Sequence, residues 1–177
     1  MPIDLASYKQ FADEDIGRPN AYEIYIEGMP EYMQIFCVKA QLPEQNMGVA
    51  PAYFQSRELK LAGDLRYGLW NAEFYGATRS GSLAVYKELC KWFNIPRDPV
   101  SNYGSASPSE YWKRVEIVVQ DYSRYKEIQN IILWDAWITQ MPSVDLSYES
   151  QDELLKIGVQ IAFSEMENDA SREEGRA

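Results

Sequence analysis

The stretch from Leu155 to Phe163 limits the possible folds more than any other part of this chain. Apolar residues alternate strictly with small or polar ones through it, and the apolar set is Leu155, Ile157, Val159, Ile161 and Phe163. A strict period of two predicts a half-buried antiparallel strand, with one face in a core and the other facing solvent or a partner. A second alternating run at residues 144–148 precedes it, across the polar segment 149–153. We therefore expect the fold to close on a pair of strands.

The rest of the chain also favours a β-rich fold. Alternating apolar residues predict further strands at residues 22–26, 32–41, 57–61, 66–75, 115–119 and 126–138. Helical spacing of apolar residues predicts one packed helix at about residues 80–94, and a short helix at residues 4–14. We therefore expect a mainly β fold, in which two packed antiparallel sheets form a sandwich or barrel with one flanking α-helix.

Three segments suggest how this fold is organised. Residues 42–56 contain two prolines and a glycine and are interpreted as a long loop or an extended hairpin, a kind of segment that is usually functional or partner-bound. The strand at 66–75 has large apolar residues on both faces, so it is expected to be buried on both sides or covered by a neighbouring subunit. Residues 165–177 hold five acids and no aromatic residue, which predicts a disordered acidic tail after a single domain at residues 1–164.

Residues suited to catalysis are scarce. The chain contains no histidine, which removes the commonest general base and the commonest zinc ligand. Glu149, Asp152 and Glu153 lie within one turn and are interpreted as a solvated turn rather than a glycosidase pair. There is no phosphate-binding loop and no nucleophile elbow in the sequence. We predict no catalytic, cofactor-binding or metal-binding residue, and hence no enzymatic activity.

The cysteines and the hydropathy give two further expectations. Cys37 and Cys90 are far apart in the sequence and are interpreted as buried free thiols, with a disulfide between them as the alternative. The N-terminus lacks the features of a signal peptide, and no apolar run is long enough to span a membrane. We expect neither export by a signal peptide nor a membrane anchor.

Aromatic residues and acidic charge narrow the function further. Trp70, Phe74, Trp134 and Trp137 are interpreted as core and interface packing rather than as a ligand-binding groove. The formal net charge is −10, which argues against a protein that grips nucleic acid through its phosphates. The same charge is compatible with a surface along which nucleic acid slides, because an acidic wall repels phosphate.

Five segments, in order, carry a resemblance to a known family. They are the opening segment 11–26 with Arg-Pro-Asn, the strand 57–64 ending in Ala-Gly-Asp, the strand around Trp70 with the following helix that ends in Lys-Trp, the Pro-Ser-Glu-Tyr segment at 108–113, and residues 133–163. The chain resembles the tail tube proteins of T4-like contractile-tailed bacteriophages. It departs from the family pattern at Asp135-Ala136-Trp137, where a proline usually follows the tryptophan pair. The resemblance therefore does not extend to the loop geometry at this point.

The resemblance implies a structural virion protein. Such proteins form hexameric rings whose sheets join into one continuous barrel, and the rings stack into the inner tube of the tail, a conduit for DNA ejection. It implies assembly in the host bacterial cytoplasm and a final place in the virion tail. The implied partners are further copies of the chain, the tail sheath, baseplate and tail terminator proteins, and the tape measure protein and DNA, which pass through the lumen without specific binding.

The long segment at 42–56 then becomes a candidate for contact between adjacent rings. Its large apolar residues are the candidate contact residues Met47, Val49, Tyr53 and Phe54. Carboxylates are expected to line the lumen, although the sequence does not identify them. Two alternatives use the same fold: the tube of a contractile system that injects protein, and an adaptor at the tube end or baseplate.

Overall fold

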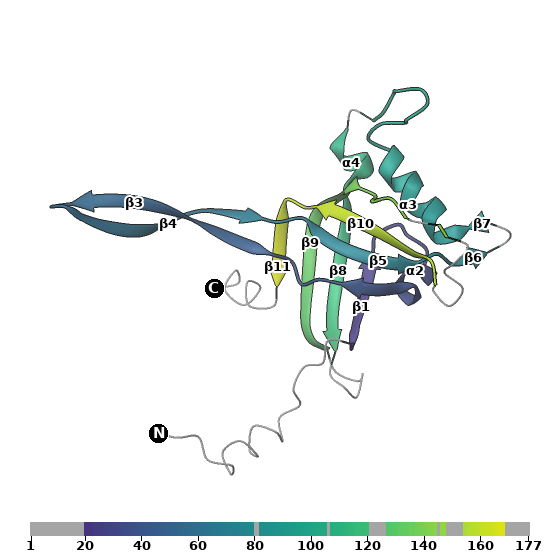
Figure 1. Ribbon diagram of the computed structural model, residues 1–177, viewed down its shortest axis with the longest axis horizontal. Helices are drawn as coiled ribbons and strands as arrows, with labels where there is room; N and C mark the ends of the chain where they lie inside the picture. The colour runs from purple at the N-terminus through teal and green to yellow at the C-terminus, as the bar shows by residue number, and fades with distance from the viewer. Residues whose placement is uncertain are drawn as a thin grey trace, which may run out of the picture.

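The computed structural model describes residues 20–79, 82–105, 107–120, 127–144, 146–147 and 154–168. Among them, seven strands form one antiparallel sheet with the order β1-β8-β9-β10-β5-β2, and β11 pairs with β9 (Figure 1). These strands are β1 (Tyr22–Ile26), β2 (Cys37–Ala40), β5 (Trp70–Tyr75), β8 (Lys113–Gln120), β9 (Glu127–Gln140), β10 (Lys156–Ala162) and β11 (Glu165–Asn168). The expected helix at residues 4–14 and the cluster of Glu149, Asp152 and Glu153 lie outside the described residues.

Strand β9 divides this sheet into two halves because it bends near Asp135. Asp135 has a φ of 56°, and the register with β8 shifts between the pairs Lys113–Ala136 and Val115–Leu133, so β9 carries one extra residue there. The inward side chains change phase across this bulge, from Ile131 and Leu133 to Ala136 and Ile138. A bulge of this kind bends a strand and increases its twist.

The bend folds the sheet into a sandwich. The first half-sheet contains β1, β8, β11 and the beginning of β9; the second contains β2, β5, β10 and the end of β9. Figure 1 shows the strands of the two halves crossing at a steep angle. The expected mainly β sandwich is thus confirmed, while the described strands of the single chain do not close into a barrel, since β1 and β2 remain as the two ends of the path.

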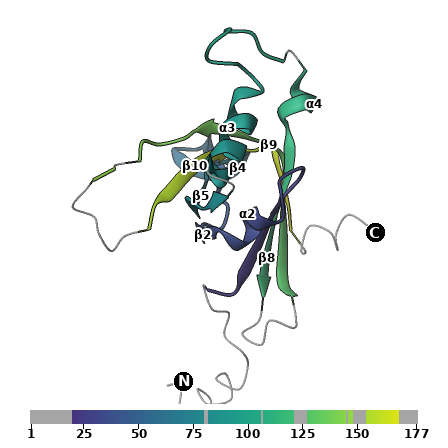
Figure 2. The same cartoon turned by 90° about the vertical axis from the view of Figure 1, so that its right-hand side faces the viewer.

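The core lies between the two half-sheets and is closed at one end by α3 (Ala84–Asn94) (Figure 2). Val85, Leu89 and Trp92 of α3 are buried in it, and the Trp92 Nε1–H donates to the carbonyl oxygen of Tyr111 at 2.8 Å. The expected flanking helix is confirmed, although it begins at Ala84 rather than near residue 80. Two one-turn helices, α2 (Tyr32–Ile35) and α4 (Pro108–Tyr111), complete the helices of the described part of the chain.

The closing strand matches its prediction. Ile157, Val159, Ile161 and Phe163 are buried, Leu155 is half-buried, and the residues between them are not buried. Ile157 pairs with Phe74 and Ile161 with Trp70 in the register between β10 and β5. The expected strand at 144–148 is wrong where it is described, because Val144 and Leu146 lie outside any strand and Leu146 is exposed.

Several strand boundaries also differ from expectation. Residues 32–41 begin as helix α2, because a turn through Gly28 and Pro30 directs Met33 into the core, and only Cys37–Ala40 is a strand. The expected strand at 66–75 is two strands that separate at Gly68 and Leu69. The tail expected at 165–177 is ordered at its start, because residues 165–168 form β11 and pair with β9; the remaining tail residues lie outside the described part.

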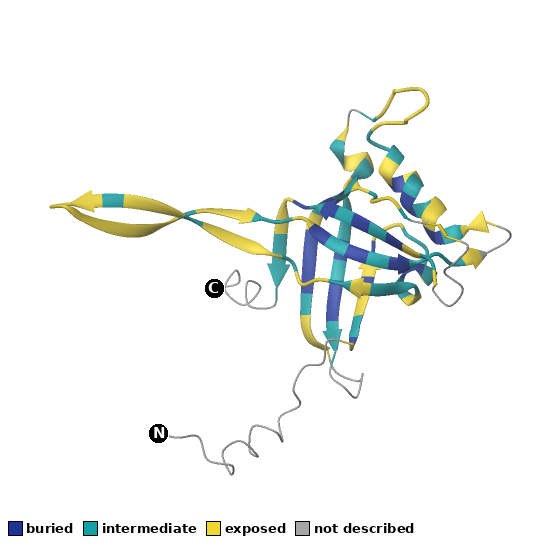
Figure 3. Cartoon of the chain, in the orientation of Figure 1, coloured by how far each residue is buried: buried dark blue, intermediate teal, exposed yellow. Residues whose placement is uncertain are grey.

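The segment at 42–56 belongs to a long hairpin, which was one of its two interpretations. It consists of β3 (Gln45–Phe54) and β4 (Arg57–Tyr67), and it projects from the sandwich as a two-stranded ribbon (Figures 1 and 3). β4 continues through residues 62–67, beyond the strand expected at residues 57–61. A second, very short hairpin joins β6 (Thr78–Arg79) to β7 (Ser82–Leu83).

Two further observations concern the expectations on cysteines and membranes. Cys37 and Cys90 are both free thiols and each is half-buried. Within the described residues, no helix combines the length and the apolar character needed to cross a bilayer.

The bend at Asp135 leads to a testable prediction. A β-branched residue is strained at a φ of 56°, whereas glycine and asparagine tolerate it. Asp135→Val is expected to lower the free energy of unfolding by about 1–3 kcal/mol, while Asp135→Gly and Asp135→Asn change it by less than about 1 kcal/mol. Urea denaturation followed by tryptophan fluorescence measures the three values, and equal losses for all three variants would contradict the role given to the bulge.

Candidate assembly surfaces

The outward face of the first half-sheet is polar and acidic. Cross-strand neighbours share a face, and the register places Tyr25 beside Glu116, Glu116 beside Ile132, and Ile132 beside Glu167. The adjacent positions add Trp134 beside Glu165. We call this surface the acidic face, and its members are Glu23, Tyr25, Arg114, Glu116, Val118, Asn130, Ile132, Trp134, Glu165 and Glu167. Val118 and Ile132 are buried within it but outside the main core cluster.

Carboxylates outnumber cations on the strands of this half-sheet. β1, β8, β9 and β11 carry six carboxylates and two cations. The carboxylates are Glu23, Glu116, Glu127, Asp135, Glu165 and Glu167. The cations are Lys113 and Arg114. The summed charge gives this surface a negative potential that repels phosphate.

The hydroxyl of Tyr25 responds to this negative charge. It donates a hydrogen bond to Glu23 Oε2 at 2.5 Å, and this bond is the main reason why the pKa of Tyr25 is raised to about 12. Burial and the negative charges of Glu23, Glu116 and Glu127 raise the pKa further in the same direction. Tyr25 therefore stays neutral and adds no charge of its own at physiological pH.

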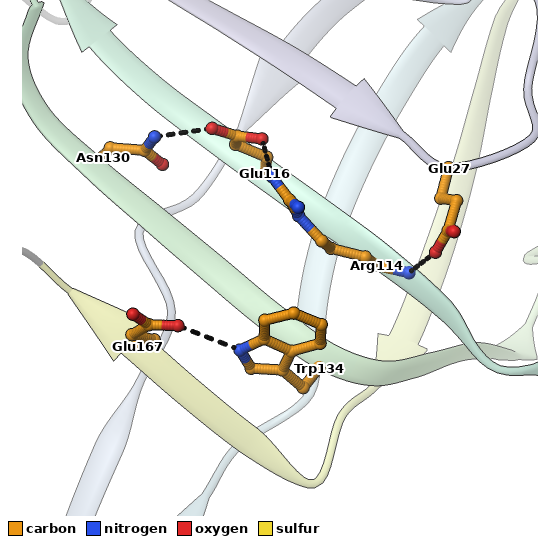
Figure 4. Close-up of polar contacts among 6 residues, drawn as sticks. All are labelled: Glu27, Arg114, Glu116, Asn130, Trp134 and Glu167. Carbon is orange, nitrogen blue, oxygen red and sulfur yellow. Dashed lines mark hydrogen bonds and ion pairs between the residues drawn. The ribbon is translucent and has the colours of Figure 1, made fainter. Parts of the chain in front are cut away.

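Both cations of the half-sheet are engaged by neighbours. The Arg114 Nη2 lies 2.5 Å from Glu116 Oε2, and its guanidinium lies over the Trp134 ring at 5.7 Å from the centroid (Figure 4). Glu116 Oε1 also accepts a hydrogen bond from Asn130 Nδ2 at 2.5 Å. Lys113 Nζ donates to the backbone oxygen of Glu27 at 3.0 Å and lies over the ring of Trp92 at 5.9 Å.

The two lateral edges of the first half-sheet are β1 and β11. Glu27 N donates to Arg114 O at 2.9 Å, and Gln120 N donates to Ala21 O at 2.9 Å. In an antiparallel ladder these bonds alternate, so the backbone groups of Tyr22 and Ile24 point away from β8. At the other side, β11 pairs only with β9 among the described strands. Edges that no neighbouring strand pairs are templates for pairing with another chain. The β1 edge is partly covered, because Ile24 is only 2% exposed.

A shallow groove lies between β1 and β2, the two ends of the strand path. It is lined by residues that include Tyr22, Tyr25, Ile35 and Cys37. Burial raises the pKa of the Cys37 thiol to about 11, and burial together with the neighbouring Cys37 raises the pKa of Tyr22 to about 12. Both groups are therefore protonated at neutral pH and give the groove no nucleophile.

The β3–β4 hairpin is the second candidate surface, and its distal part has two different faces. The pairs Ala50–Leu61, Ala52–Leu59 and Phe54–Arg57 alternate with Val49–Ala62, Pro51–Lys60 and Tyr53–Glu58. Because alternate cross-strand pairs point to opposite sides, the first set forms one face of the hairpin. We call it the apolar ribbon face, because its members are Ala50, Ala52, Phe54, Leu59 and Leu61, with Arg57 as the one charged residue at the tip. The second set forms a mixed ribbon face that includes Glu58 and Lys60.

Two facing glycines lie where the proximal and distal parts of the hairpin meet. A Cβ added to Gly63 would lie 3.0 Å from the Gly48 backbone, and one added to Gly48 would lie 3.2 Å from Asp64 O. The register shifts at the same place, between Met47 and Val49. The two glycines therefore permit a close approach of the strands that larger residues would prevent.

The four predicted contact residues all lie on this hairpin and are all exposed. Their exposed fractions are 54% for Met47, 63% for Val49, 76% for Tyr53 and 66% for Phe54. They do not share one face: Phe54 lies on the apolar ribbon face, Val49 and Tyr53 on the mixed ribbon face, and Met47 opposite Leu65 near the base.

Two leucines that the hairpin exposes on β4 were not among the predicted contact residues. Leu59 and Leu61 are more than half exposed. Their alternation with Glu58 and Lys60 is visible in the sequence and predicted a short strand at residues 57–61, without indicating a contact surface.

The tryptophans divide between the core and the acidic face. Trp70 and Phe74 are buried as expected, and the Trp70 Nε1–H donates to Gln41 O at 2.6 Å. Trp137 is half-buried against Tyr111, with ring centroids 6.1 Å apart. Trp134 is on the outward side, where its Nε1–H donates to Glu167 Oε2 at 3.3 Å, so it does not belong to the core, and interface packing stays a prediction for it.

Among the described residues, no three His, Cys, Asp or Glu side chains come together as a metal site. The surfaces that the fold presents are thus an acidic sheet face, two strand edges and an apolar hairpin.

Comparison with known structures gives neighbours of the same fold. A sheath/tube terminator of the PVC extracellular contractile injection system superposes with a TM-score of 0.64 at 10% identity, covering 88% of this chain and 98% of that one. The sheath–tube complex of the same system gives 0.61 at 10% identity, covering 91% and 96%. The baseplate of the anti-feeding prophage gives 0.58 at 15% identity, covering 83% and 89%. At these identities the likeness concerns the fold.

Comparison of the sequence with protein families is more specific. No curated protein matches. The family described as phage tail tube protein matches residues 6–167, which include every described strand except the last residue of β11. The chain therefore belongs to the phage tail tube protein family.

Proposed function

We propose that this chain assembles into stacked hexameric rings that form the inner tube of a contractile phage tail, through which DNA is ejected into the host. The tube would be enclosed by the tail sheath and bounded by the baseplate and the tail terminator. The observation that carries the proposal is the first half-sheet, which combines an acidic outward face with two lateral strands, β1 and β11, that each pair with a single neighbour among the described strands.

Ring formation follows from these edges. β1 of one copy can pair with β11 of the next, which would join the first half-sheets into a continuous wall and remove both edges at once. The acidic face would then line the bore. A passing duplex carries a dense negative charge and would be repelled from the wall on all sides.

Ring stacking is the proposed role of the hairpin. A two-stranded ribbon is marginally stable by itself in water, and this one exposes apolar side chains on both faces. Contact with another copy in the adjacent ring would cover Leu59, Leu61 and Phe54 on one side, and Val49 and Tyr53 on the other. Met47 would be covered near the base.

A tube that injects protein is the second candidate, because the sheath–tube complex of an extracellular contractile injection system has the same fold. The cargo separates the two functions: particles that contain this chain and carry packaged DNA belong to a phage. An adaptor at the tube end is a third possibility, which differs from both tubes in stopping at a single ring.

The test is negative-stain electron microscopy of the purified full-length chain over a range of protein concentrations. We expect long hollow tubes built of six-fold rings. Isolated rings that do not lengthen at high concentration would identify an adaptor. A chain that remains monomeric at high concentration would contradict the proposed function.

A further inference from the structure

Arg114 is the exposed cation of the acidic face, and its surroundings are unusual for a surface arginine. Its side chain is 41% exposed, yet it contacts Glu116 at 2.5 Å (Figure 4) and lies over the ring of Trp134. The two partners come from different strands: Glu116 is two residues along β8, and Trp134 is on β9. The guanidinium is thus held from two directions.

Each partner of Arg114 is itself held in place. Glu116 Oε1 accepts from Asn130 Nδ2 at 2.5 Å, which leaves its Oε2 directed at Arg114. The Trp134 Nε1–H donates to Glu167 Oε2 at 3.3 Å, which orients the ring beneath the guanidinium. The backbone N–H of Arg114 donates to Glu27 Oε2 at 3.1 Å and anchors the strand at this point. Four strands or their ends therefore contribute to the position of one cation.

A free arginine would matter on this surface because guanidinium groups bind phosphate in a bidentate manner. If the acidic face lines a bore of six-fold symmetry, every ring would present a set of such arginines to a passing duplex. Each phosphate contact would add to the retention of DNA in a salt-dependent way.

We propose that Glu116 and Trp134 are positioning residues that hold Arg114, so that the acidic face offers no free cation to a passing polyanion. The inference rests on the proposed function for its biological meaning, but the arrangement itself belongs to the single chain. Lys113 is kept from the polyanion in a different way, by Glu27 and Trp92 at the end of the half-sheet.

The first test measures the retention of DNA. Fluorescent duplex DNA is added during assembly, the tubes are sedimented, and the DNA in the pellet is measured at low and at high salt. Tubes of Glu116→Gln are expected to retain about tenfold more DNA than the unaltered chain at about 50 mM salt, and to lose this gain at high salt. The double variant Arg114→Gln/Glu116→Gln is expected to return to the level of the unaltered chain.

The matched control is Glu88→Gln. Glu88 forms an ion pair with Lys91 at 2.5 Å on α3, so this variant makes the same change in charge and frees a cation outside the acidic face. An equal gain with Glu88→Gln, no gain with Glu116→Gln, or a gain that persists in the double variant would each overturn the proposal.

The second test needs no assembly and no substitution. Phenylglyoxal modifies accessible guanidinium groups. The unaltered chain is treated under conditions in which it is monomeric, and mass spectrometry gives the rate of modification at each arginine. Arg114 is expected to react several-fold more slowly than Arg57 and Arg66 of the exposed hairpin. Equal rates would overturn the proposal even if tubes form, whereas a failure to form tubes would contradict the proposed function and leave the slow rate of Arg114 as the expected result.

Discussion

Replacing Leu59 and Leu61 together by threonine is expected to leave a folded chain that no longer forms tubes. The two leucines lie on the apolar ribbon face, outside the sandwich core, and are 54% and 56% exposed. Threonine keeps a high strand propensity and adds no charge, so the hairpin itself should persist. If the next ring buries these side chains, their loss weakens each contact by about 3 kcal/mol, which is roughly a hundredfold in the association constant.

The control for this double variant lies on the same hairpin. Lys60→Gln alters the mixed ribbon face between the two leucines and is expected to keep assembly within about threefold of normal, because it removes no apolar surface and a single surface charge contributes little. Circular dichroism reports the fold, and sedimentation with negative-stain microscopy reports assembly. If the leucine variant forms normal tubes at the protein concentration at which the unaltered chain does, the apolar ribbon face does not take part in the stacking contact.

Ending the chain after Ser164 is expected to abolish ring closure, while ending it after Asn168 is expected to preserve it. The shorter chain lacks β11, which pairs with residues 131–134 of β9 and forms one lateral edge of the first half-sheet. The buried core cluster ends at Phe163, and only the half-buried Met166 packs against it from β11. The shorter chain should therefore still fold, although β9 would become an unpaired edge.

The comparison of the two truncations separates the strand from the residues that follow it. Analytical ultracentrifugation should give monomers for the chain ending at Ser164, and rings or tubes for the chain ending at Asn168. Rings formed by the shorter chain would show that closure uses an edge other than β11. Loss of assembly in both chains would show that residues beyond 168 are needed.

The sequence predicted those elements whose pattern of apolar residues is regular within the element itself. β10 was predicted with its correct phase, because Ile157, Val159 and Ile161 alternate without interruption. α3 was also predicted from helical spacing, but with another phase. The spacing was counted on Leu83, Tyr86, Leu89, Cys90 and Phe93, whereas the buried residues are Val85, Leu89 and Trp92. Both elements bury a regular stripe, and such a stripe can be recognised in one sequence.

The bend of β9 could not be predicted in the same way. It needs a residue with positive φ inside an apolar run, and Asp135 gives only a weak signal for this. The phase of the strand changes at the bulge, so Trp134 follows the outward positions Asn130 and Ile132, whereas Ala136, the next residue in that alternation, is buried. The acidic face was equally hidden, because the carboxylates of β1, β8 and β11 come together only through the register of the strands.

The hairpin shows a third kind of limit. Leu59 and Leu61 alternate with charged residues as in a half-buried strand, yet in the single chain they are more than half exposed. Burial in an assembly and burial in a core leave the same pattern in the sequence. The four candidates named from the sequence were drawn from β3, because Pro43 and Pro51 marked that segment as irregular, whereas residues 57–61 were predicted only as a short strand.

Strand β9 belongs to both half-sheets, and this has a mechanical consequence for the proposed tube. The first half-sheet, which would form the inner wall of the tube, and the second half-sheet share the continuous backbone of β9. This strand has hydrogen bonds to β8 and β11 at one end and to β10 at the other. The two layers therefore cannot slide or separate without breaking that strand's own ladder. A tube built from such subunits would keep a constant bore while the surrounding machine contracts, and would act as a stiff barrel rather than as a valve.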